Sequence, residues 1–373
     1  MDYKVKGLVK SSVYSDAYEI ANSSLSWEKL KGKNILITGA GGFIGYYMVL
    51  GLLTRNDIFG DSIKVQALVR NEQRAEAKYG ELLKRDDLSL CIQDVSDEIK
   101  AQKADFVVHA ASQASNIQFE NDPVGTINAN LTGTSRVLDF AKKCGSEASL
   151  IISSLKVYGQ VFNGKDYLCE EDIGYIDQTS YKNCYAIGKR AAETLCACYA
   201  KQYGMNIKIA RPAYIYGASS LDDDRVWAQF IANIVRRESI LLKSNGAALR
   251  SFCYVTDTVT GLLTILLSGE NVTPYNIAYE KSDVTIRGFA KTACEVFPER
   301  KMSLSFANPS DEEEPVRNTS SSSQTPEILD GSRLKALGWK PLVDLKEGIR
   351  RAVAVLEEAV SYTHLTLPTI YSV

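Results

Sequence analysis

Histidine is almost absent from this sequence, with only His109 and His364 among 373 residues. With only two histidines, we expect neither a histidine-based metal site nor a Ser-His-Asp catalytic triad. The eight cysteines lack the spacing of a metal site. We therefore expect no bound metal, and we expect reduced, mostly buried thiols in a cytoplasmic protein.

The chain also lacks a strong charge bias and a long apolar run. Its formal net charge is -2, which does not favour binding to nucleic acid or to an acidic membrane surface. No segment reaches the roughly 20 apolar residues that cross a bilayer, and the first residues lack the apolar run of a signal peptide. We expect neither nucleic acid nor membrane as a partner.

What the sequence does contain is an alternation of short apolar strands with helical segments. This alternation predicts an α/β fold, with a Rossmann doubly wound parallel sheet in residues 33–216 and a smaller C-terminal α/β substrate lobe in 217–359. The strands of the sheet are expected at 34–38, 64–69, 88–91, 105–109, 149–153 and 207–210. In the lobe we expect a strand at 251–255 and helices at 227–236, 259–267, 334–339 and 345–356.

The remaining segments have weaker patterns. Residues 1–32 are predicted to be a polar, weakly patterned extension. Residues 308–324 are acidic and then serine-rich, which predicts a mobile loop. From Val360 the sequence reads like a translated sequencing adapter, so we expect 360–373 to be a non-native tail.

A glycine-rich turn follows the first predicted strand and precedes a predicted helix. Gly39, Gly42 and Gly45 permit a tight turn, a close approach of a pyrophosphate and close helix packing. The free N–H groups of the helix N-terminus, near Phe43 and Ile44, suit phosphate oxygens. This order of elements predicts a dinucleotide site.

Further residues of the predicted dinucleotide site follow the next strands. Arg70 stands near the position where an acidic residue would hold the ribose of NAD, so it can receive the 2′-phosphate of NADP or lie in a solvated basic loop with Arg74 and Lys78. NAD and NADP both remain open as cofactors. His109 is predicted to be a packed strand-end residue. The other candidates for cofactor contact are Asp94, Val95, Ala110, Ala111 and Asn130.

A tyrosine and a lysine four residues apart, Tyr185 and Lys189, fall on one face of a predicted helix. A lysine ammonium near a phenol favours the phenolate, which is otherwise a minor species at neutral pH because the usual pKa of tyrosine is about 10. Such pairs are common on solvated helix faces, so the pair alone does not indicate an enzyme.

Taken together, the motifs resemble those of the extended short-chain dehydrogenase/reductases, specifically the NAD-dependent epimerase/dehydratase group that acts on nucleotide sugars. The resemblance runs from about Lys33 to Val355. Besides the glycine turn and the Tyr185/Lys189 pair, it rests on Ser153-Ser154-x-x-Val157-Tyr158-Gly159, Arg211-Pro212-x-x-x-Tyr216-Gly217, Arg250-Ser251-Phe252-x-Tyr254-Val255-x-Asp257 and Leu337-Gly338-Trp339-x-Pro341.

The resemblance implies roles for individual residues. Tyr185 would be the base that removes a proton from a sugar hydroxyl, Lys189 would lower its pKa and hold the nicotinamide ribose, and Ser154 would hydrogen-bond the reacting oxygen. Arg225 and Arg250 are candidates for the substrate diphosphate, because guanidinium groups suit phosphate oxygens, although either could form a surface salt bridge instead. Ser112 and Lys156 are further candidates for substrate contact. Members of the family often dimerise, so we expect a homodimer.

The reaction within the family is less defined. Residues 184–195 and the segments at Asp222–Val226 and Arg250–Tyr254 look most like UDP-glucuronate decarboxylases. Decarboxylases and 4,6-dehydratases usually carry an acid at or just before the position of Lys156, and dehydration needs one to expel a hydroxyl. Tyr214 also stands before the Tyr216-Gly217 pair at a position where members of the family commonly have asparagine. In having a lysine at position 156, the sequence is similar to the CDP-sugar 2-epimerases.

These departures favour an epimerase that oxidises a sugar hydroxyl transiently to a ketone. The alternatives are a UDP-glucuronate decarboxylase, an NADPH-dependent keto-sugar reductase and a non-catalytic nucleotide-binding protein.

Overall fold

The computed structural model describes residues 12–113, 116–161, 164–312 and 327–366. Within these ranges, seven parallel strands form one sheet in the order β10-β6-β5-β4-β1-β2-β3. Their bounds are β1 Asn34–Thr38, β2 Lys64–Val69, β3 Leu88–Ile92, β4 Phe106–His109, β5 Ala148–Ile152, β6 Ile207–Pro212 and β10 Pro274–Ile277. The first six follow the doubly wound order 3-2-1-4-5-6, which confirms the predicted fold.

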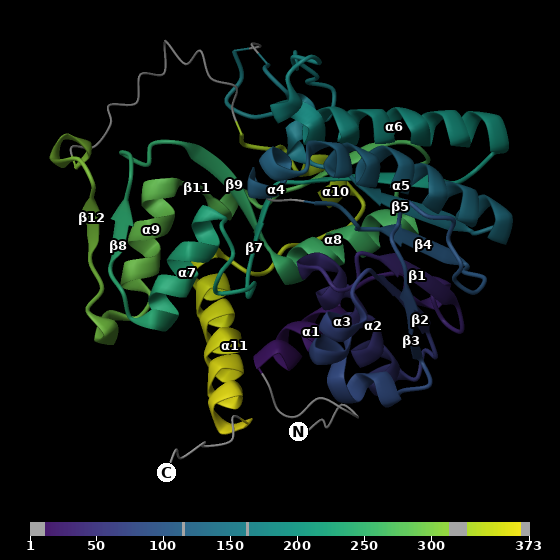
Figure 1. Ribbon diagram of the computed structural model, residues 1–373, viewed down its shortest axis with the longest axis horizontal. Coiled ribbons are helices and arrows are strands. Elements are labelled where there is room, and N and C mark those ends of the chain that lie inside the picture. Colours follow the sequence, from purple (N-terminus) through teal and green to yellow (C-terminus); the bar gives the residue numbers. More distant parts are fainter. Residues whose placement is uncertain (1–11, 114–115, 162–163, 313–326, 367–373) are drawn as a thin grey trace.

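Helices cover both faces of this sheet (Figure 1). One layer contains α5 (Pro123–Cys144) and α6 (Cys184–Tyr203), which pack against each other. The other contains α1 (Ser12–Asn22), α2 (Phe43–Phe59), α3 (Glu72–Tyr79) and α8 (Val255–Ser268). Successive side chains of β1 point to opposite faces of the sheet, and this alternation explains the two layers. Ile35 and Ile37 pack in the cluster that holds α2, whereas Leu36 packs against residues of α5. Both faces of a parallel sheet are thereby removed from water.

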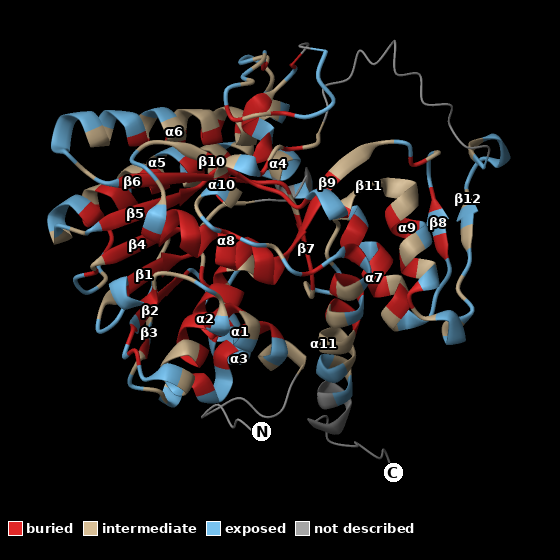
Figure 2. Ribbon diagram, turned by 180° about the vertical axis from the view of Figure 1, so that it is seen from behind, coloured by how far each residue is buried: buried red, intermediate tan, exposed pale blue. Residues whose placement is uncertain are grey.

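The smaller lobe is built from short strands and three longer helices. Its elements are β7 (Tyr214–Tyr216), α7 (Val226–Arg236), β8 (Ile240–Leu242), β9 (Leu249–Tyr254), β11 (Asp283–Thr285), α9 (Ile286–Glu295), β12 (Leu304–Phe306) and α11 (Leu345–Thr366). The short helix α10 (Ser332–Ala336) packs instead on β10 and α8. In Figure 1 α7, α9, β8 and β12 lie beside the sheet domain, and α11 runs along the boundary. Figure 2 shows the buried strands at the centre and exposed residues along the outer helices.

The division of the chain at residue 217 does not follow the sheet. β10 comes from beyond that position and pairs with β6, and α8 packs on β5 and β6. The chain thus leaves the sheet domain after β6, builds part of the lobe, and returns. The predicted division is wrong at this point because β10 extends the sheet beyond β6 and α8 covers β5 and β6. A strand pattern that ends at β6 does not reveal these two elements.

The N-terminal segment also departs from expectation, because residues 12–22 form helix α1 instead of a weakly patterned extension. Ala17, Ile20 and Ala21 are buried, and Ile20 lies so close to Gly51 of α2 that a Cβ on that glycine would meet its side chain at 2.4 Å. α1 is therefore part of the packed structure. The predicted loop at 308–324 and the predicted tail at 360–373 lie largely outside the described residues, although α11 continues to Thr366.

Candidate active site

The glycine turn after β1 forms a narrow cradle. Gly39 has a φ of +67°, and a Cβ there would lie 2.7 Å from the backbone of Ala111. A Cβ on Gly45 would meet the carbonyl oxygen of Gly39 at 2.5 Å. Gly42 caps the N-terminus of α2, and its N–H donates to the Gly39 carbonyl oxygen at 2.8 Å. Only glycine permits these contacts, which leave the helix N-terminus accessible to an anion.

A cavity of about 460 Å³ opens at this turn. The sequence-predicted residues that line it come from the ends of four parallel strands, as expected for a ligand site of a doubly wound sheet. They are Gly39, Gly42, Arg70, Asp94, Val95, Ala110, Ala111 and Ser112. The cavity size, the glycine cradle and the small residues of the wall fit a bound dinucleotide.

The predicted cofactor residues Phe43, Ile44, Gly45 and Asn130 are not among the residues that line this cavity. Phe43 and Ile44, the first residues of α2, pack against the large core cluster, and the ring of Phe43 lies 6.0 Å from that of Trp227. Asn130 is buried; it accepts a hydrogen bond from Ser112 Oγ at 3.0 Å and donates to the carbonyl oxygen of Thr126 at 2.8 Å. Asn130 therefore fixes the position of Ser112.

Three cations surround the end of β2. Arg70, Arg74 and Lys78 line the cavity, together with Asn71, which caps α3 by accepting from the Arg74 N–H at 2.8 Å. Lys78 Nζ donates to the Gly41 carbonyl oxygen at 3.0 Å, and burial lowers the pKa of Lys78 to about 8. Arg70 reaches Asp94 at 3.7 Å, with both side chains largely exposed. The cavity wall near the expected ribose is therefore positively charged.

Ser154 and Lys189 lie near Tyr185. The ring of Phe119 stacks on the Tyr185 ring with 4.8 Å between centroids. Burial raises the pKa of Tyr185, whereas the hydrogen bond with Ser154 and then the charge of Lys156 lower it. Lys189 Nζ lies 5.7 Å from the centroid of the Tyr185 ring and donates to the Ile152 carbonyl oxygen at 2.6 Å. Burial lowers the pKa of Lys189 to about 8.

The helix that carries Tyr185 is fixed to the strand ends by buried polar contacts. Arg211 of β6 binds both carboxylate oxygens of Glu193, at 2.9 Å and 2.6 Å. The same carboxylate accepts a hydrogen bond from Ser153 Oγ, next to Ser154. Arg190 donates to the carbonyl oxygens of Val157 and Gly174. These bonds hold α6 and the Ser154 segment in one relative position.

His109 has the packed position predicted for it. Its side chain is buried, and Nδ1 lies 2.8 Å from Thr38 Oγ1. Burial, followed by the charge of Lys189, lowers the pKa of His109 to about 3. The imidazole is therefore neutral at physiological pH.

A second cavity, of about 260 Å³, lies beside the turn after Ser154 and the start of α6, although neither Ser154 nor Tyr185 lines it. Lys156 and Glu327 line it, as do Asn183 and Ala186 from the start of α6. Lys156 Nζ contacts Glu327 Oε1 at 2.6 Å. Because the residues that flank Ser154 and Tyr185 in sequence line this cavity, it is the candidate site for the substrate.

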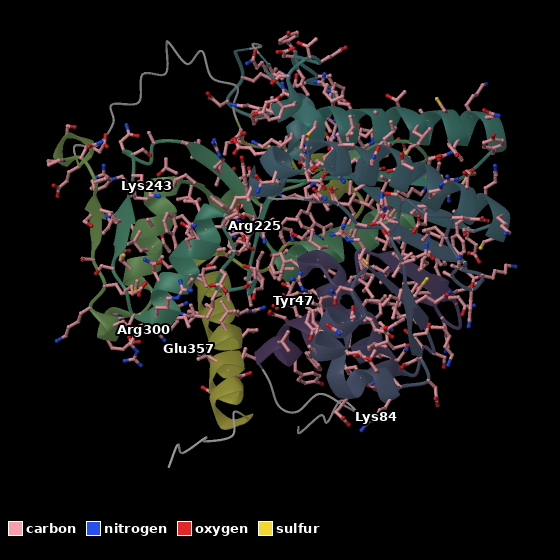
Figure 3. The ribbon with its side chains drawn as sticks, in the orientation of Figure 1. Tyr47, Lys84, Arg225, Lys243, Arg300 and Glu357 are labelled. Atoms are coloured by element: carbon pink, nitrogen blue, oxygen red, sulfur yellow. The ribbon has the colours of Figure 1, made fainter. Side chains whose placement is uncertain are left out.

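The two predicted phosphate-binding arginines have different surroundings. Arg250 Nη1 contacts Glu327 Oε2 at 2.6 Å, which joins it to the Lys156 cluster. Arg225 forms an ion pair with Asp223, and its guanidinium lies over Trp227, 4.6 Å from the ring centroid. Figure 3 shows Arg225 beside the start of α7, where the lobe meets the sheet domain. Neither of the two cavities described above is lined by Arg225.

Glu327 and Phe119 were not predicted from the sequence as residues of the candidate site. Glu327 lies 171 residues from Lys156 and directly after the serine-rich segment, so no local pattern links the two. Phe119 lies on the short helix α4 (Asn116–Asn121), where nothing in the sequence points toward Tyr185. Both contacts depend on tertiary structure.

In the described part of the chain, no cluster of three or more histidine, cysteine, aspartate or glutamate side chains has the arrangement of a metal site. None of the described helices combines the length and the apolar character needed to span a bilayer.

Comparison with known proteins gives matches over most of the chain. The profile of the NAD-dependent epimerase/dehydratase family matches residues 35–278. UDP-glucuronic acid decarboxylase 3 of Arabidopsis thaliana is 33% identical over 320 residues, which cover 84% of this chain and 86% of that protein. UDP-glucuronic acid decarboxylase 1 of Danio rerio is 28% identical over 86% of this chain and 72% of that protein.

Two solved structures have the same fold. The UDP-glucose 4-epimerase of Thermotoga maritima has a TM-score of 0.71 and 23% identity, over 88% of this chain and 99% of that one. The UDP-glucuronic acid 4-epimerase of Bacillus cereus has a TM-score of 0.69 and 20% identity, over 87% and 99%. With the profile match and the relatives above, these findings lead to one conclusion. The chain belongs to the NAD-dependent epimerase/dehydratase family of enzymes.

Proposed function

We propose that this protein oxidises a hydroxyl of a nucleotide sugar transiently to a ketone and returns the hydride, so that the net reaction is an epimerisation. The observation that carries the proposal is the contact between Ser154 and Tyr185 beside a cavity lined by their sequence neighbours. A base with a hydrogen-bonding hydroxyl beside it is the arrangement that proton abstraction requires.

A dinucleotide held at the glycine turn of Gly39 and Gly42 would supply the acceptor and donor of the hydride. Tyr185 removes the proton from the sugar hydroxyl, and Ser154 holds the reacting oxygen by a hydrogen bond. In this proposal the charge of Lys189 is expected to favour the phenolate of Tyr185, and its hydrogen bond to the Ile152 carbonyl oxygen keeps the ammonium at a fixed position. Lowering the pKa of a tyrosine from about 10 to about 7 requires roughly 4 kcal/mol of differential stabilisation, which cationic groups can provide in a site shielded from water.

Decarboxylation of a nucleotide-linked uronic acid is the second candidate. It is favoured by Lys156 and Arg250, two cations beside the substrate cavity that could bind a sugar carboxylate, and by the similarity to the curated decarboxylases. Oxidation of the hydroxyl next to the carboxylate-bearing carbon would produce a β-keto acid. Breakage of the bond to the carboxylate would release carbon dioxide and leave an enolate, which takes up a proton on carbon, and the remaining ketone would accept the returned hydride.

For the cofactor, we propose that the cavity binds either NAD or NADP, with room for the 2′-phosphate of NADP. Arg70, Arg74 and Lys78 line the wall near the expected ribose, and arginine suits phosphate oxygens. A preference for NADP would favour the keto-sugar reductase among the alternatives, because that reductase takes its hydride from NADPH.

The experiment is incubation of the purified protein with UDP-, CDP-, GDP- and dTDP-sugars in the presence of each dinucleotide, followed by mass spectrometry and NMR. Unchanged mass with a new sugar spectrum supports epimerisation. Loss of 44 mass units, the mass of carbon dioxide, supports decarboxylation instead. Stoichiometric consumption of NADPH with a keto sugar supports the reductase. Failure to bind any dinucleotide or to convert any sugar would contradict the proposed function.

A further inference from the structure

The candidate substrate cavity has a lining with more negative than positive charge. Among the described residues that line it, the charged side chains are Lys156, Asp177 and Glu327. The Asp177 carboxylate accepts hydrogen bonds from the hydroxyl of Thr179 at 2.7 Å and from its N–H at 2.9 Å, and these bonds lower the pKa of Asp177. Asp177 is therefore ionised at neutral pH, and one lysine stands against two carboxylates.

The lysine of this lining is already paired. Lys156 Nζ contacts Glu327 Oε1 at 2.6 Å and donates to Tyr214 Oη at 3.0 Å. Glu327 Oε2 in turn accepts from Tyr214 Oη at 3.0 Å and lies 2.6 Å from Arg250 Nη1. Burial raises the pKa of Glu327, but the charge and the hydrogen bond of Lys156, followed by the charge of Arg250, lower it overall. One ionised carboxylate thus holds both cations.

This arrangement has a consequence for a sugar that carries a carboxylate. Such a group would reach Lys156 or Arg250 only by replacing Glu327, whose two charged contacts at 2.6 Å would be broken. Its negative charge would then lie in one cavity with Asp177 and the displaced Glu327, and like charges that share a site repel each other. An uncharged sugar meets neither cost.

The uncharged part of the lining suits sugar hydroxyl groups. Gln160 and Asn183 contribute side-chain amides, which both donate and accept hydrogen bonds, as hydroxyl groups do. Tyr175 contributes a ring that is 63% exposed and offers an apolar face with a polar tip. These groups can bind a polyhydroxylated ring without a charge on the ligand.

We propose that this cavity accepts nucleotide sugars whose sugar is uncharged and discriminates against those with a sugar carboxylate, and that Glu327 is the residue that sets this specificity. The inference rests on the proposed function, in which this cavity holds the substrate. It favours epimerisation of a neutral sugar over decarboxylation, because decarboxylation requires a uronic acid.

The test measures binding of ligand pairs that differ only in a CH₂OH group against a carboxylate. The pairs are UDP-glucose and UDP-glucuronate, UDP-galactose and UDP-galacturonate, and GDP-mannose and GDP-mannuronate. Calorimetry in a Tyr185→Phe background measures affinity without turnover. We expect the neutral member of a pair that binds to do so about tenfold more tightly, because the repulsion acts over a few ångströms in a partly hydrated site.

Glu327→Gln in the same background removes the charge and keeps the shape of the side chain. Lys156 and Arg250 then become available to a sugar carboxylate, so the affinity ratio should shift toward the uronate by about tenfold, with little change for the neutral sugar. Glu147→Gln is the matched control. It removes a carboxylate that also lies 2.6 Å from a lysine, Lys33, but directly before β5 at the opposite end of the sheet, and its ratio should not change.

Lys156→Gln gives a second shift in the opposite direction. It leaves Asp177 and Glu327 in the lining without the lysine, so the preference for the neutral sugar should increase. Thermal denaturation checks that both variants fold, and this variant keeps the inference testable if Glu327→Gln does not.

The outcomes separate the inference from the proposed function. Uronates that bind as tightly as their neutral partners before Glu327 is changed would overturn the inference, as would an affinity ratio that neither Glu327→Gln nor Lys156→Gln alters. Tighter binding of the neutral sugars without conversion of any sugar by the wild-type enzyme would refute only the proposed function. Failure of every pair to bind would refute both.

Discussion

At the scale of single residues, Tyr185 is the first test of the catalytic assignment. Tyr185→Phe removes the proton acceptor and keeps the ring that stacks on Phe119. We expect kcat to fall by at least 10³-fold, at the upper part of the range for general acid–base catalysis, while dinucleotide binding persists in a fluorescence titration. Tyr181→Phe, at an exposed tyrosine just before the same helix, is the matched control and should retain activity. Near-normal turnover in Tyr185→Phe would exclude this residue as the base.

The positive wall of the dinucleotide cavity gives a prediction about cofactor choice. Arg70→Ala removes one charged donor from the wall near the expected 2′-phosphate. We expect NADPH to bind about 10-fold more weakly, because a hydrogen bond to a charged group contributes roughly 1.5–3 kcal/mol, while binding of NADH changes less than twofold.

Lys84→Ala is the control for Arg70→Ala. Lys84 is an exposed cation after α3 that Figure 3 shows at the far end of the sheet domain. Both affinities should be unchanged in this variant, as measured by calorimetry. Equal losses for NADPH and NADH in Arg70→Ala would mean that Arg70 does not discriminate between the cofactors.

Gly39, Tyr185 and Lys189 stand in short motifs whose spacing reflects local geometry, so the sequence alone marks them as candidates. Ser154 was marked by the family resemblance, and the roles of all four residues stay predictions. Glu327 could not be predicted from the sequence, because its partner Lys156 is 171 positions away and only the fold brings the two together.

At the scale of elements, the turn between β1 and α2 can be tested with two alanine substitutions. Both Gly39 and Gly60 have a φ of +67°, but a Cβ on Gly39 would clash with the Ala111 backbone, whereas no atom lies within 4 Å of one on Gly60. Gly60→Ala should therefore cost only the backbone strain, about 1–2 kcal/mol. Gly39→Ala should destabilise the protein further and abolish dinucleotide binding.

The measurements are chemical denaturation and a dinucleotide titration of both variants. Equal stability and equal binding in the two proteins would contradict a steric role for the Gly39 turn. The comparison is matched because the two glycines have the same φ, so alanine suffers the same backbone strain at both positions.

Elements with a clear local signal were predicted, and α1 was not. The apolar run of β1 and the glycine turn that follows it define that part of the fold without help from distant residues. By contrast, α1 is short, and its buried Asp16 looks like a surface residue in the sequence. The stability of such a helix comes from packing on α2 and α8.

At the scale of the whole molecule, α1 connects the sheet domain to the lobe through Asp16. Its carboxylate accepts a hydrogen bond from Tyr254 Oη at 2.8 Å and lies 3.5 Å from Arg351 of α11. Burial raises the pKa of Asp16 to about 7, against the lowering effects of Tyr254 and Arg351. A folded-state pKa above that of the unfolded chain means that this contribution to stability is present at low pH and is lost as the pH rises from about 4 to 7.

Asp16→Asn removes this titration and keeps an acceptor for Tyr254. The variant should therefore gain stability relative to the wild type as the pH rises from 5 to 8, with a relative increase in Tm on the order of a few degrees. Differential scanning calorimetry at the two pH values measures the effect. A difference in Tm that is independent of pH would show that Asp16 does not titrate in this range.

The return of the chain to the sheet has a consequence for modularity. A fragment that ends at residue 216 would lack β10 and α8, so the edge of β6 and one sheet face would be exposed, a condition that promotes aggregation. The excised lobe would in turn carry two elements that have no sheet to join. A recombinant exchange of substrate lobes between relatives must therefore divide the chain at several points, and a single crossover would separate parts that fold together.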